Sequence, residues 1–235
     1  MNQSQAKPRE VHLWKYCLLD PVPEISMDWF SEEEKEAIAK RESYAQRIQF
    51  IRVHAFLKKV LERYTRQPAN QIHLVSGRYG KPMIKCDHFH PPFFFSLSYR
   101  QDYSLLAISN ESCVGVDVER IEEIEDFFPF LNDNFSLKEQ KRILAEESER
   151  QQLSLLYALW TMKEAVVKSL AIGLPRKLSK YDLSFFLDQP IGLQQFDPTH
   201  FWRIELVPVA ERYKAAIAMR ASEVDVKTFD YATRL

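Results

Sequence analysis

CVGVDVE, residues 113–119, carries an apolar side chain at every second position. Successive side chains of a β-strand point to opposite faces, so the three valines are expected to share a core face. Gly115, Asp117 and Glu119 then share the other face, where the glycine leaves room for a close approach. The stretch therefore predicts a strand that holds two carboxylates side by side, although taken alone it also fits an edge strand with a polar outer face.

The segments before this strand predict a first set of helices and strands. Residues 93–99 and 103–109 have strand character, and the short polar connections between them and residues 113–119 predict an antiparallel meander. Residues 10–19 are expected to form another strand. A helical stretch begins at the capping box of Ser31 and Glu34, breaks near Ser43 and ends at about residue 64.

The second half contains similar parts in a similar order. We expect an irregular Phe-rich stretch over 121–135, a helix capped by Ser136 and Glu139, a longer helix over 150–171, and strands near 183–187, 201–208 and 213–220. The predicted fold class is α+β, with two similar lobes related by a pseudo-twofold axis. Each lobe would pack a small, mostly antiparallel sheet against a long helix, with lobes at residues 1–112 and 113–235 and the functional site at their interface.

Composition excludes several classes of protein. The 235 residues are 46% hydrophobic and 28% charged with a net charge of −1, which gives no reason to expect a nucleic-acid binder. Only 5 glycines argue against a glycine-rich nucleotide cradle. Cys17, Cys86 and Cys113 have no CxxC spacing, which indicates reduced, mostly buried thiols. With no signal peptide and no stretch long enough to span a membrane, we expect a cytoplasmic protein.

The stretch WTMKEAVVK, residues 160–168, places a carboxylate in an apolar helix face. Glu164 follows Trp160 by four residues, and a buried carboxylate is unfavourable unless it is paired or binds a metal. An ion pair with Lys168 at helical spacing is one explanation. The other is that Glu164 joins Asp117 and Glu119 in an all-oxygen ligand set suited to Mg²⁺.

A Mg²⁺ site of this kind implies a phosphate-bearing substrate. Basic residues that could hold phosphate occur in GRYGKP, residues 77–82, and at Arg47 and Arg52 of the first long helix. The loop lacks the full P-loop spacing, and no GxSxG or HExxH motif is present. Because no nucleophile is evident, the attacking hydroxyl is expected to come from a partner.

Four blocks in order resemble the signature of the 4′-phosphopantetheinyl transferases, specifically the Sfp-like, two-lobed, single-chain type. They are GRYGKP (77–82), FSLSY (95–99), GVDVE (115–119) and WTMKEAVVKSLAIGL (160–174). The resemblance implies transfer of the 4′-phosphopantetheine arm of coenzyme A to a serine of an acyl or peptidyl carrier protein, with release of adenosine 3′,5′-bisphosphate.

The resemblance also implies roles for the carboxylates and the lysine. Asp117, Glu119 and Glu164 would bind Mg²⁺ at the pyrophosphate, and Lys168 would contact the phosphates and neutralise or protonate the leaving side. Asp117, Glu164 and Lys168 are thus the expected catalytic residues. Either Glu164 or a metal-bound water would take the serine proton.

The same resemblance suggests which residues bind coenzyme A. They are Arg47, Arg52, Gly80, Lys81, Pro82, Ser98, Tyr99, Arg100 and Lys168. The family's third block usually reads Phe-Asn-x-Ser-His-Ser, so Tyr99 stands where a histidine would contact the 3′-phosphate. Tyrosine carries no charge, which leaves either Arg100 to supply it or a weaker grip on that phosphate. A regular strand would point Arg100 away from Tyr99.

Carrier proteins of this family's kind are acidic helical domains, so a basic and apolar docking rim is expected for a transient complex with a monomeric enzyme. Candidates are Phe127, Phe128, Phe130, Phe135, Lys138, Lys141 and Arg142, with buried core phenylalanines as the alternative. Two other functions remain open. One is a catalytically impaired coenzyme A-binding protein on the same scaffold, and the other is a Mg²⁺ phosphohydrolase of another fold.

Overall fold

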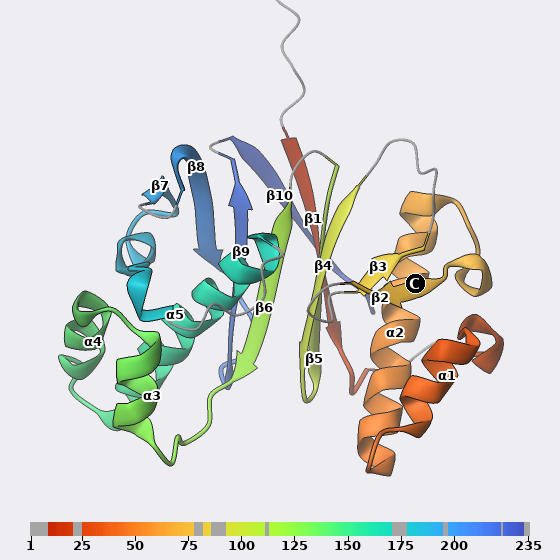
Figure 1. Ribbon diagram of the computed structural model, residues 1–235, viewed down its shortest axis with the longest axis horizontal. Coiled ribbons are helices and arrows are strands. Elements are labelled where there is room, and N and C mark those ends of the chain that lie inside the picture. Colours follow the sequence, from red (N-terminus) through yellow and green to blue (C-terminus); the bar gives the residue numbers. More distant parts are fainter. Residues whose placement is uncertain are drawn as a thin grey trace, which may run out of the picture.

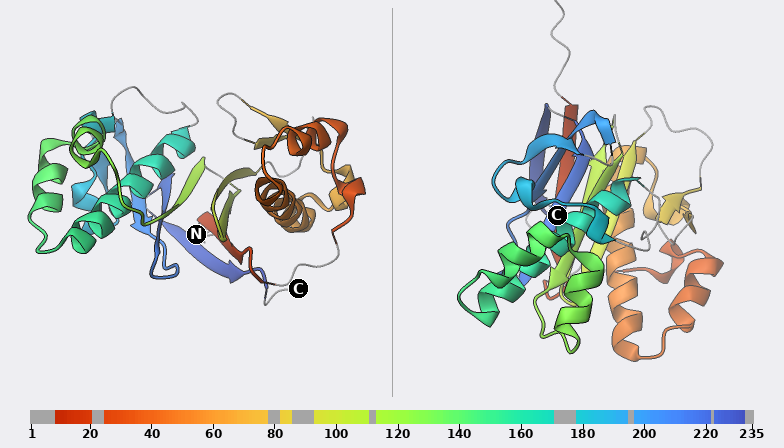
Figure 2. Two further views of the ribbon diagram at one scale, coloured as in Figure 1. Left: turned by 90° about the horizontal axis from the view of Figure 1, so that it is seen from below. Right: turned by 60° about the vertical axis from the view of Figure 1, so that its left-hand side comes forward.

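The chain folds as an α+β protein with two four-stranded sheets between two groups of helices (Figures 1 and 2). A computed structural model describes residues 9–20, 25–77, 82–85, 93–110, 113–170, 178–194, 197–221 and 223–232. Helices α1 and α2 lie on one side of the strands, and α3, α4 and α5 lie on the other. The α+β class is confirmed, and the pseudo-twofold relation between lobes stays a prediction.

The first sheet has the strand order β10-β1-β5-β4. Its strands are β1 (Arg9–Cys17), β4 (Phe94–Arg100), β5 (Tyr103–Ser109) and β10 (Val224–Asp230). All pairings are antiparallel except that of β10 with β1, which is parallel. A strand from the end of the chain therefore completes the first sheet, while the division at residue 112 stays a prediction. The short strands β2 (Leu74–Ser76) and β3 (Pro82–Ile84) form a separate ribbon.

The second sheet is antiparallel throughout, with the order β6-β9-β8-β7. Its strands are β6 (Val114–Arg120), β7 (Ile191–Gln194), β8 (Asp197–Leu206) and β9 (Tyr213–Arg220). The predicted meander is wrong in one respect, because β6 pairs with β9 rather than with β5. The valine face of β6 is buried between the two sheets. The short connection from β5 to β6 does not by itself determine which strand forms main-chain hydrogen bonds with β6.

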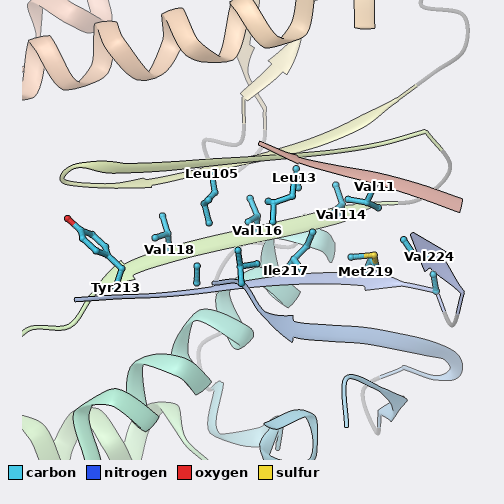
Figure 3. Packing of buried hydrophobic residues seen from close by; sticks show 14 residues of the cluster. Val11, Leu13, Leu105, Val114, Val116, Val118, Tyr213, Ile217, Met219 and Val224 are labelled. Carbon is cyan, nitrogen blue, oxygen red and sulfur yellow. The ribbon is translucent and has the colours of Figure 1, made fainter. Parts of the chain in front are cut away.

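One hydrophobic core fills the space between the sheets. Leu13 and Leu105 of the first sheet face Val116 and Ile217 of the second (Figure 3), and all four side chains are buried. The outer face of the first sheet packs against α2, and that of the second packs against α5. Because β5 is buried on both faces, almost all of its residues are buried, not only alternate ones.

The first helices follow the prediction closely. Helix α1 (Glu32–Ala39) starts at the capping box of Ser31 and Glu34, and α2 (Tyr44–Thr65) starts at a second capping box at Ser43, where the break was expected. A lysine is expected to project into solvent, but Lys58 does not. Its ammonium is buried and lies 2.7 Å from Glu34 Oε2, so it ties α2 to α1.

The second group of helices departs from the prediction at two places. Residues 121–135 were expected to be irregular but contain α3 (Phe127–Asn134), which is followed by α4 (Leu137–Leu144) and α5 (Glu149–Leu170). The segment near 183–187 is a short 3₁₀ turn, not a strand, because Leu183 and Phe186 both point into the core beneath α5. The described 3₁₀ turns are Met27–Trp29, Ala69–Gln71, Leu178–Lys180 and Ser184–Leu187.

A buried ion pair fixes α4 against α5. Lys163 Nζ lies 2.9 Å from Glu139 Oε2, and both side chains are fully buried. The ammonium also donates to the carbonyl of Leu178, and the other Glu139 oxygen accepts from the main-chain N–H of Leu183. The capping box at Ser136 therefore uses a glutamate that also neutralises a core lysine.

Gly115 allows α5 to lie directly on β6. A Cβ atom at this position would be 1.8 Å from the carbonyl oxygen of Ala165 and 2.5 Å from the main-chain nitrogen of Ser169. The room predicted on the carboxylate face is therefore occupied by helix backbone. Because of this close packing, Glu164 and Lys168 lie beside Asp117 and Glu119.

No helix in the described part of the chain is both long enough and apolar enough to cross a membrane. Cys17 and Cys113 are free thiols. Contrary to the expectation of mostly buried thiols, Cys113 is exposed and Cys17 is half-buried. Cys86 lies outside the described residues.

Candidate active site at the junction of the sheets

Asp117 lies at the centre of a cluster of charged side chains, and only 2% of it is exposed. Lys168 Nζ donates to its Oδ1 at 2.7 Å, and the Ser98 hydroxyl donates to the same oxygen at 2.9 Å. Lys168 thus reaches from α5 to Asp117 on β6. The expected alternative, an ion pair with Glu164 within the helix, does not account for this contact. The structure brings together the predicted aspartate and lysine from opposite elements.

Glu119 lies two residues further along the same face of β6. Arg100 Nε approaches its Oε2 at 3.2 Å, and the same guanidinium contacts Glu122 at 3.5 Å. Burial and the charge of Asp117 nonetheless raise the pKa of Glu119 to about 7. The position of Arg100 agrees with strand alternation, because its side chain points away from that of Tyr99.

Glu164 completes the acidic cluster from α5. Burial first, and then repulsion from Asp117, raise its pKa to about 7. Among the described residues, Glu164 Oε1 and Asp117 Oδ2 are buried without a hydrogen-bond partner. Such atoms are unfavourable in a protein interior, and their presence on neighbouring carboxylates indicates that Lys168 and Arg100 leave part of the cluster without a donor or cation.

The donor atoms of this cluster fit Mg²⁺ by their chemistry. Asp117, Glu119 and Glu164 offer only carboxylate oxygens, the ligands that Mg²⁺ prefers, and two of those oxygens have no donor among the residues that the structure describes. Lys168 forms an ion pair with Asp117, and Arg100 forms one with Glu119. In this arrangement, no three His, Cys, Asp or Glu side chains in the described ranges are placed to hold a metal ion together. Occupation by Mg²⁺ therefore stays a prediction that the unpartnered oxygens support.

A large cavity of about 1270 Å³ opens on the other side of β4. Aromatic rings line part of it, including Phe30, Phe50 and Tyr99. Polar and charged lining residues are Ser31, Glu32, Glu33, Glu34, Arg41, His54, His73 and Lys85. The His54 ring stacks on Phe50 with centroids 3.8 Å apart, and the Arg41 guanidinium lies 4.7 Å from the same ring. Flat rings beside cationic groups suit a ligand that joins an aromatic base to phosphates.

The predicted coenzyme A residues divide between these two places and others. Tyr99 and Pro82 line the cavity, whereas the Ser98 hydroxyl contacts Asp117 and Lys168. Arg100 contacts Glu119 and Glu122, so its guanidinium lies on the carboxylate side of β4. Gly80 and Lys81 lie outside the described residues.

Arg47 and Arg52 lie on α2 and donate hydrogen bonds to main-chain carbonyls of segments outside that helix. Arg47 Nε donates to the carbonyl of Arg41, and an Arg52 guanidinium nitrogen donates to that of Asp20, both at 3.0 Å. Neither arginine is among the residues that line the cavity. Their role in binding coenzyme A stays a prediction.

Sequence reasoning missed four basic cavity residues, Arg41, His54, His73 and Lys85. They come from the end of α1, from α2 and from the segments beside β2 and β3, and no spacing links them. The nearest signal was the position of Arg41 two residues before the cap of α2, which alone does not indicate a ligand site.

The proposed docking rim is partly core. Phe135 is fully buried, and Phe130 packs against Trp160 with ring centroids 5.0 Å apart. Phe128, in contrast, is 63% exposed, and Leu137 of α4 is 75% exposed. Lys138 and Lys141 are exposed on the same helix, but Lys138 Nζ lies 3.6 Å from an Asp182 oxygen and Arg142 is held by Asp188. Of the proposed rim, exposed apolar side chains therefore remain at Phe128 and Leu137, and exposed lysines at Lys138 and Lys141.

Comparison with protein families identifies the second half of the chain. Residues 113–218 match the sequence model of the 4'-phosphopantetheinyl transferase superfamily. This range contains β6 and α5, and thus all three carboxylates and Lys168.

Individual relatives agree with this match. The chain is 29% identical over 182 residues to the human L-aminoadipate-semialdehyde dehydrogenase-phosphopantetheinyl transferase, which covers 70% of this chain and 58% of the human protein. It is 25% identical over 203 residues to the 4'-phosphopantetheinyl transferase HetI of Nostoc sp., covering 85% of this chain and 83% of HetI. A match to the 4'-phosphopantetheinyl transferase AcpT of Salmonella typhi is 38% identical over 95 residues, 40% of this chain and 47% of AcpT.

Proposed function

We propose that this chain, of which residues 113–218 match the sequence model of the 4'-phosphopantetheinyl transferase superfamily, transfers 4′-phosphopantetheine from coenzyme A to a serine of an acyl or peptidyl carrier protein. Adenosine 3′,5′-bisphosphate is the second product. The observation that carries the proposal is the cluster of Asp117, Glu119, Glu164 and Lys168, in which two buried carboxylate oxygens lack a donor in the described part of the chain.

The cavity beside β4 is the proposed site for the nucleotide end of coenzyme A. Its aromatic side chains offer a surface on which adenine can stack. Arg41 and Lys85 supply positive charge for the phosphates, and Tyr99 offers one hydroxyl hydrogen bond. Ser98 and Tyr99 are adjacent on β4 and point to opposite faces of the strand. Tyr99 therefore faces the nucleotide cavity, and Ser98 faces the carboxylate cluster.

The carboxylate cluster is the proposed site of phosphoryl transfer. The carrier serine oxygen forms a bond to the phosphorus that bears the pantetheine arm, and the bond from that phosphorus to the bridging oxygen breaks. The electron pair of the broken bond stays with the departing adenosine bisphosphate. Lys168, whose ammonium already lies beside Asp117, neutralises the charge that develops on the leaving phosphate.

Glu164 is the proposed acceptor of the serine proton. Its Oε1 atom has no hydrogen-bond partner among the described residues, which leaves it able to accept that proton. Mg²⁺ held by Asp117, Glu119 and Glu164 would supply charge neutralisation and orientation of the diphosphate.

The exposed surface at Phe128, Leu137 and Lys138 is the proposed docking site for the carrier. It combines apolar side chains with positive charge, which suits an acidic helical partner. Monomeric state and cytoplasmic location stay predictions of the sequence.

Mass spectrometry of an apo carrier protein tests the function. Purified protein, coenzyme A and Mg²⁺ should add one phosphopantetheine to the carrier, and inorganic phosphate should not appear. Calorimetric binding of coenzyme A without transfer to any of several carriers would instead identify the catalytically impaired alternative. Release of phosphate or phosphopantetheine without a carrier would identify a hydrolase.

A further inference from the structure

Two serine hydroxyls join the sheets where the edge strands β4 and β6 meet. Ser96 Oγ accepts a hydrogen bond from the Val116 N–H at 3.2 Å, and Ser98 Oγ accepts one from the Val118 N–H at 3.3 Å. These strands belong to different sheets, so the hydroxyls take the place of a main-chain ladder. Both serines are buried, with 1% of Ser96 and 6% of Ser98 exposed.

Ser98 differs from Ser96 in its contacts with the charged cluster. Its hydroxyl donates to Asp117 Oδ1 at 2.9 Å and accepts from Lys168 Nζ at 2.9 Å. Lys168 Nζ also donates to the same Asp117 oxygen at 2.7 Å, which closes a triangle. A hydroxyl has one donor hydrogen and two acceptor lone pairs, and Ser98 uses all three.

This triangle occupies one side of the Asp117 carboxylate. Oδ1 receives both hydrogen bonds, whereas Oδ2 is buried without a partner among the described residues. The Ser98 hydroxyl is itself fixed by the Val118 N–H of the same strand that carries Asp117. Rotation of the carboxylate is therefore opposed from both the first sheet and α5.

We propose that Ser98 is a positioning residue: by holding Asp117 Oδ1 and Lys168 Nζ together, its hydroxyl keeps Asp117 Oδ2 available as a cation ligand. This inference rests on the proposed function in one respect, the assignment of Asp117 as a metal ligand. It makes the junction between the sheets part of the cation site, because the first sheet contributes the hydroxyl that orients a carboxylate of the second.

Ser96 provides a matched control. Ser96→Ala and Ser98→Ala each remove one buried hydroxyl that accepts a β6 main-chain N–H, but only Ser98→Ala touches the charged triangle. Mn²⁺ is the probe, and its binding is followed by electron paramagnetic resonance of the unbound ion, without coenzyme A or carrier. Thermal unfolding of each variant and the transfer assay, with KM and kcat measured separately, accompany the titration.

The two alanine variants should lose similar thermal stability and differ in Mn²⁺ affinity. Ser98→Ala should weaken Mn²⁺ binding about tenfold, the equivalent of one hydrogen bond to a charged group, while Ser96→Ala stays close to wild type. Ser98→Thr keeps a hydroxyl and should restore most of the affinity. Ser98→Cys keeps the side-chain size but its thiol forms only weak hydrogen bonds, so its Mn²⁺ affinity should fall about as far as that expected of Ser98→Ala. It takes the place of Ser98→Ala in the comparison if the alanine variant does not fold.

Equal Mn²⁺ affinity in Ser96→Ala and Ser98→Ala, or no rescue by Ser98→Thr, would overturn the positioning role. The proposed function would still stand if the wild-type protein transferred phosphopantetheine to the carrier. Wild-type protein that transfers phosphopantetheine but holds no Mn²⁺ would also overturn it. Failure of the proposed function is a separate result, because it requires a wild-type protein that transfers nothing. Loss of CoA affinity alone in Ser98→Ala, with Mn²⁺ binding unchanged, would assign the hydroxyl to the substrate instead.

Discussion

The backbone of Gly115 touches the backbone of Ala165, and a methyl group at Gly115 would lie 1.8 Å from the Ala165 carbonyl oxygen. Neither group can move aside like a flexible side chain, since one belongs to the backbone of β6 and the other to the backbone of α5. This contact sets the distance between the strand that carries Asp117 and Glu119 and the helix that carries Glu164 and Lys168.

Gly115→Ala should therefore displace α5 and disturb the whole cluster. Overpacking of a tight core site destabilises by about 1–3 kcal/mol or more, and transfer activity should fall with it. Cys113→Ala, an exposed position one residue before the same strand, is the control and should unfold like wild type. Urea unfolding measures both, and a wild-type free energy of unfolding for Gly115→Ala would contradict the contact.

Lys168→Ala should slow transfer far more than it affects stability. The change removes the ammonium from Asp117 and the charge proposed to neutralise the leaving phosphate, so kcat should fall about 100-fold or more. Arg150→Ala removes a cation from the exposed start of the same helix and should leave kcat unchanged. Steady-state transfer to an apo carrier distinguishes the two, and equal rates would remove Lys168 from the mechanism.

Arg41→Ala should weaken binding of coenzyme A without preventing transfer. Its guanidinium lines the cavity, and loss of one charge-assisted hydrogen bond should raise the KM for coenzyme A about tenfold with kcat nearly constant. The comparison is Arg63→Ala, which removes an α2 guanidinium that packs on Trp14 of β1. An unchanged KM in Arg41→Ala would place the nucleotide outside this cavity.

Glu34 gives the fold an acid-sensitive component. Burial alone would raise its pKa, but hydrogen bonds from His54, Lys58 and the Ser31 main chain outweigh burial and lower the pKa below 4.5. A lowered pKa in the folded state stabilises the protein above pH 4.5, and that stabilisation is lost as the pH falls through the folded-state pKa.

Glu34→Gln leaves Lys58 buried without its charged partner and should lower the free energy of unfolding by about 3–5 kcal/mol at pH 7. The difference between wild type and Glu34→Gln should shrink below pH 4.5, where wild-type Glu34 becomes protonated. Urea unfolding at several pH values checks this, and a difference that stays constant down to pH 3 would contradict the ion pair.

Local sequence signals predicted much of the fold. The capping boxes at Ser31 and Ser136 mark helix starts within one residue, and alternation along residues 113–119 gives the correct buried face. Those features depend on neighbours a few positions apart. The pairing of β6 with β9 and of β10 with β1 joins residues about a hundred or more positions apart, which periodicity does not encode.

The candidate site was predictable in part for the same reason. Glu164 stood out as a carboxylate in an apolar helix face, and Asp117 as a carboxylate beside a glycine. Lys58 and Glu34, in contrast, are buried because each neutralises the other, so neither looks like a core residue alone. Arg41 was missed because the cavity brings it together with residues from three other segments.

Transfer of phosphopantetheine to an apo carrier, followed by mass spectrometry in wild type, Asp117→Asn and Glu164→Gln, tests the central claim most directly. The wild-type protein should add one arm per carrier, and each neutral variant should slow the reaction about 100-fold or more while remaining folded. A carrier mass that never changes with the wild-type protein, or full activity in either variant, would contradict the assignment of this cluster as the active site.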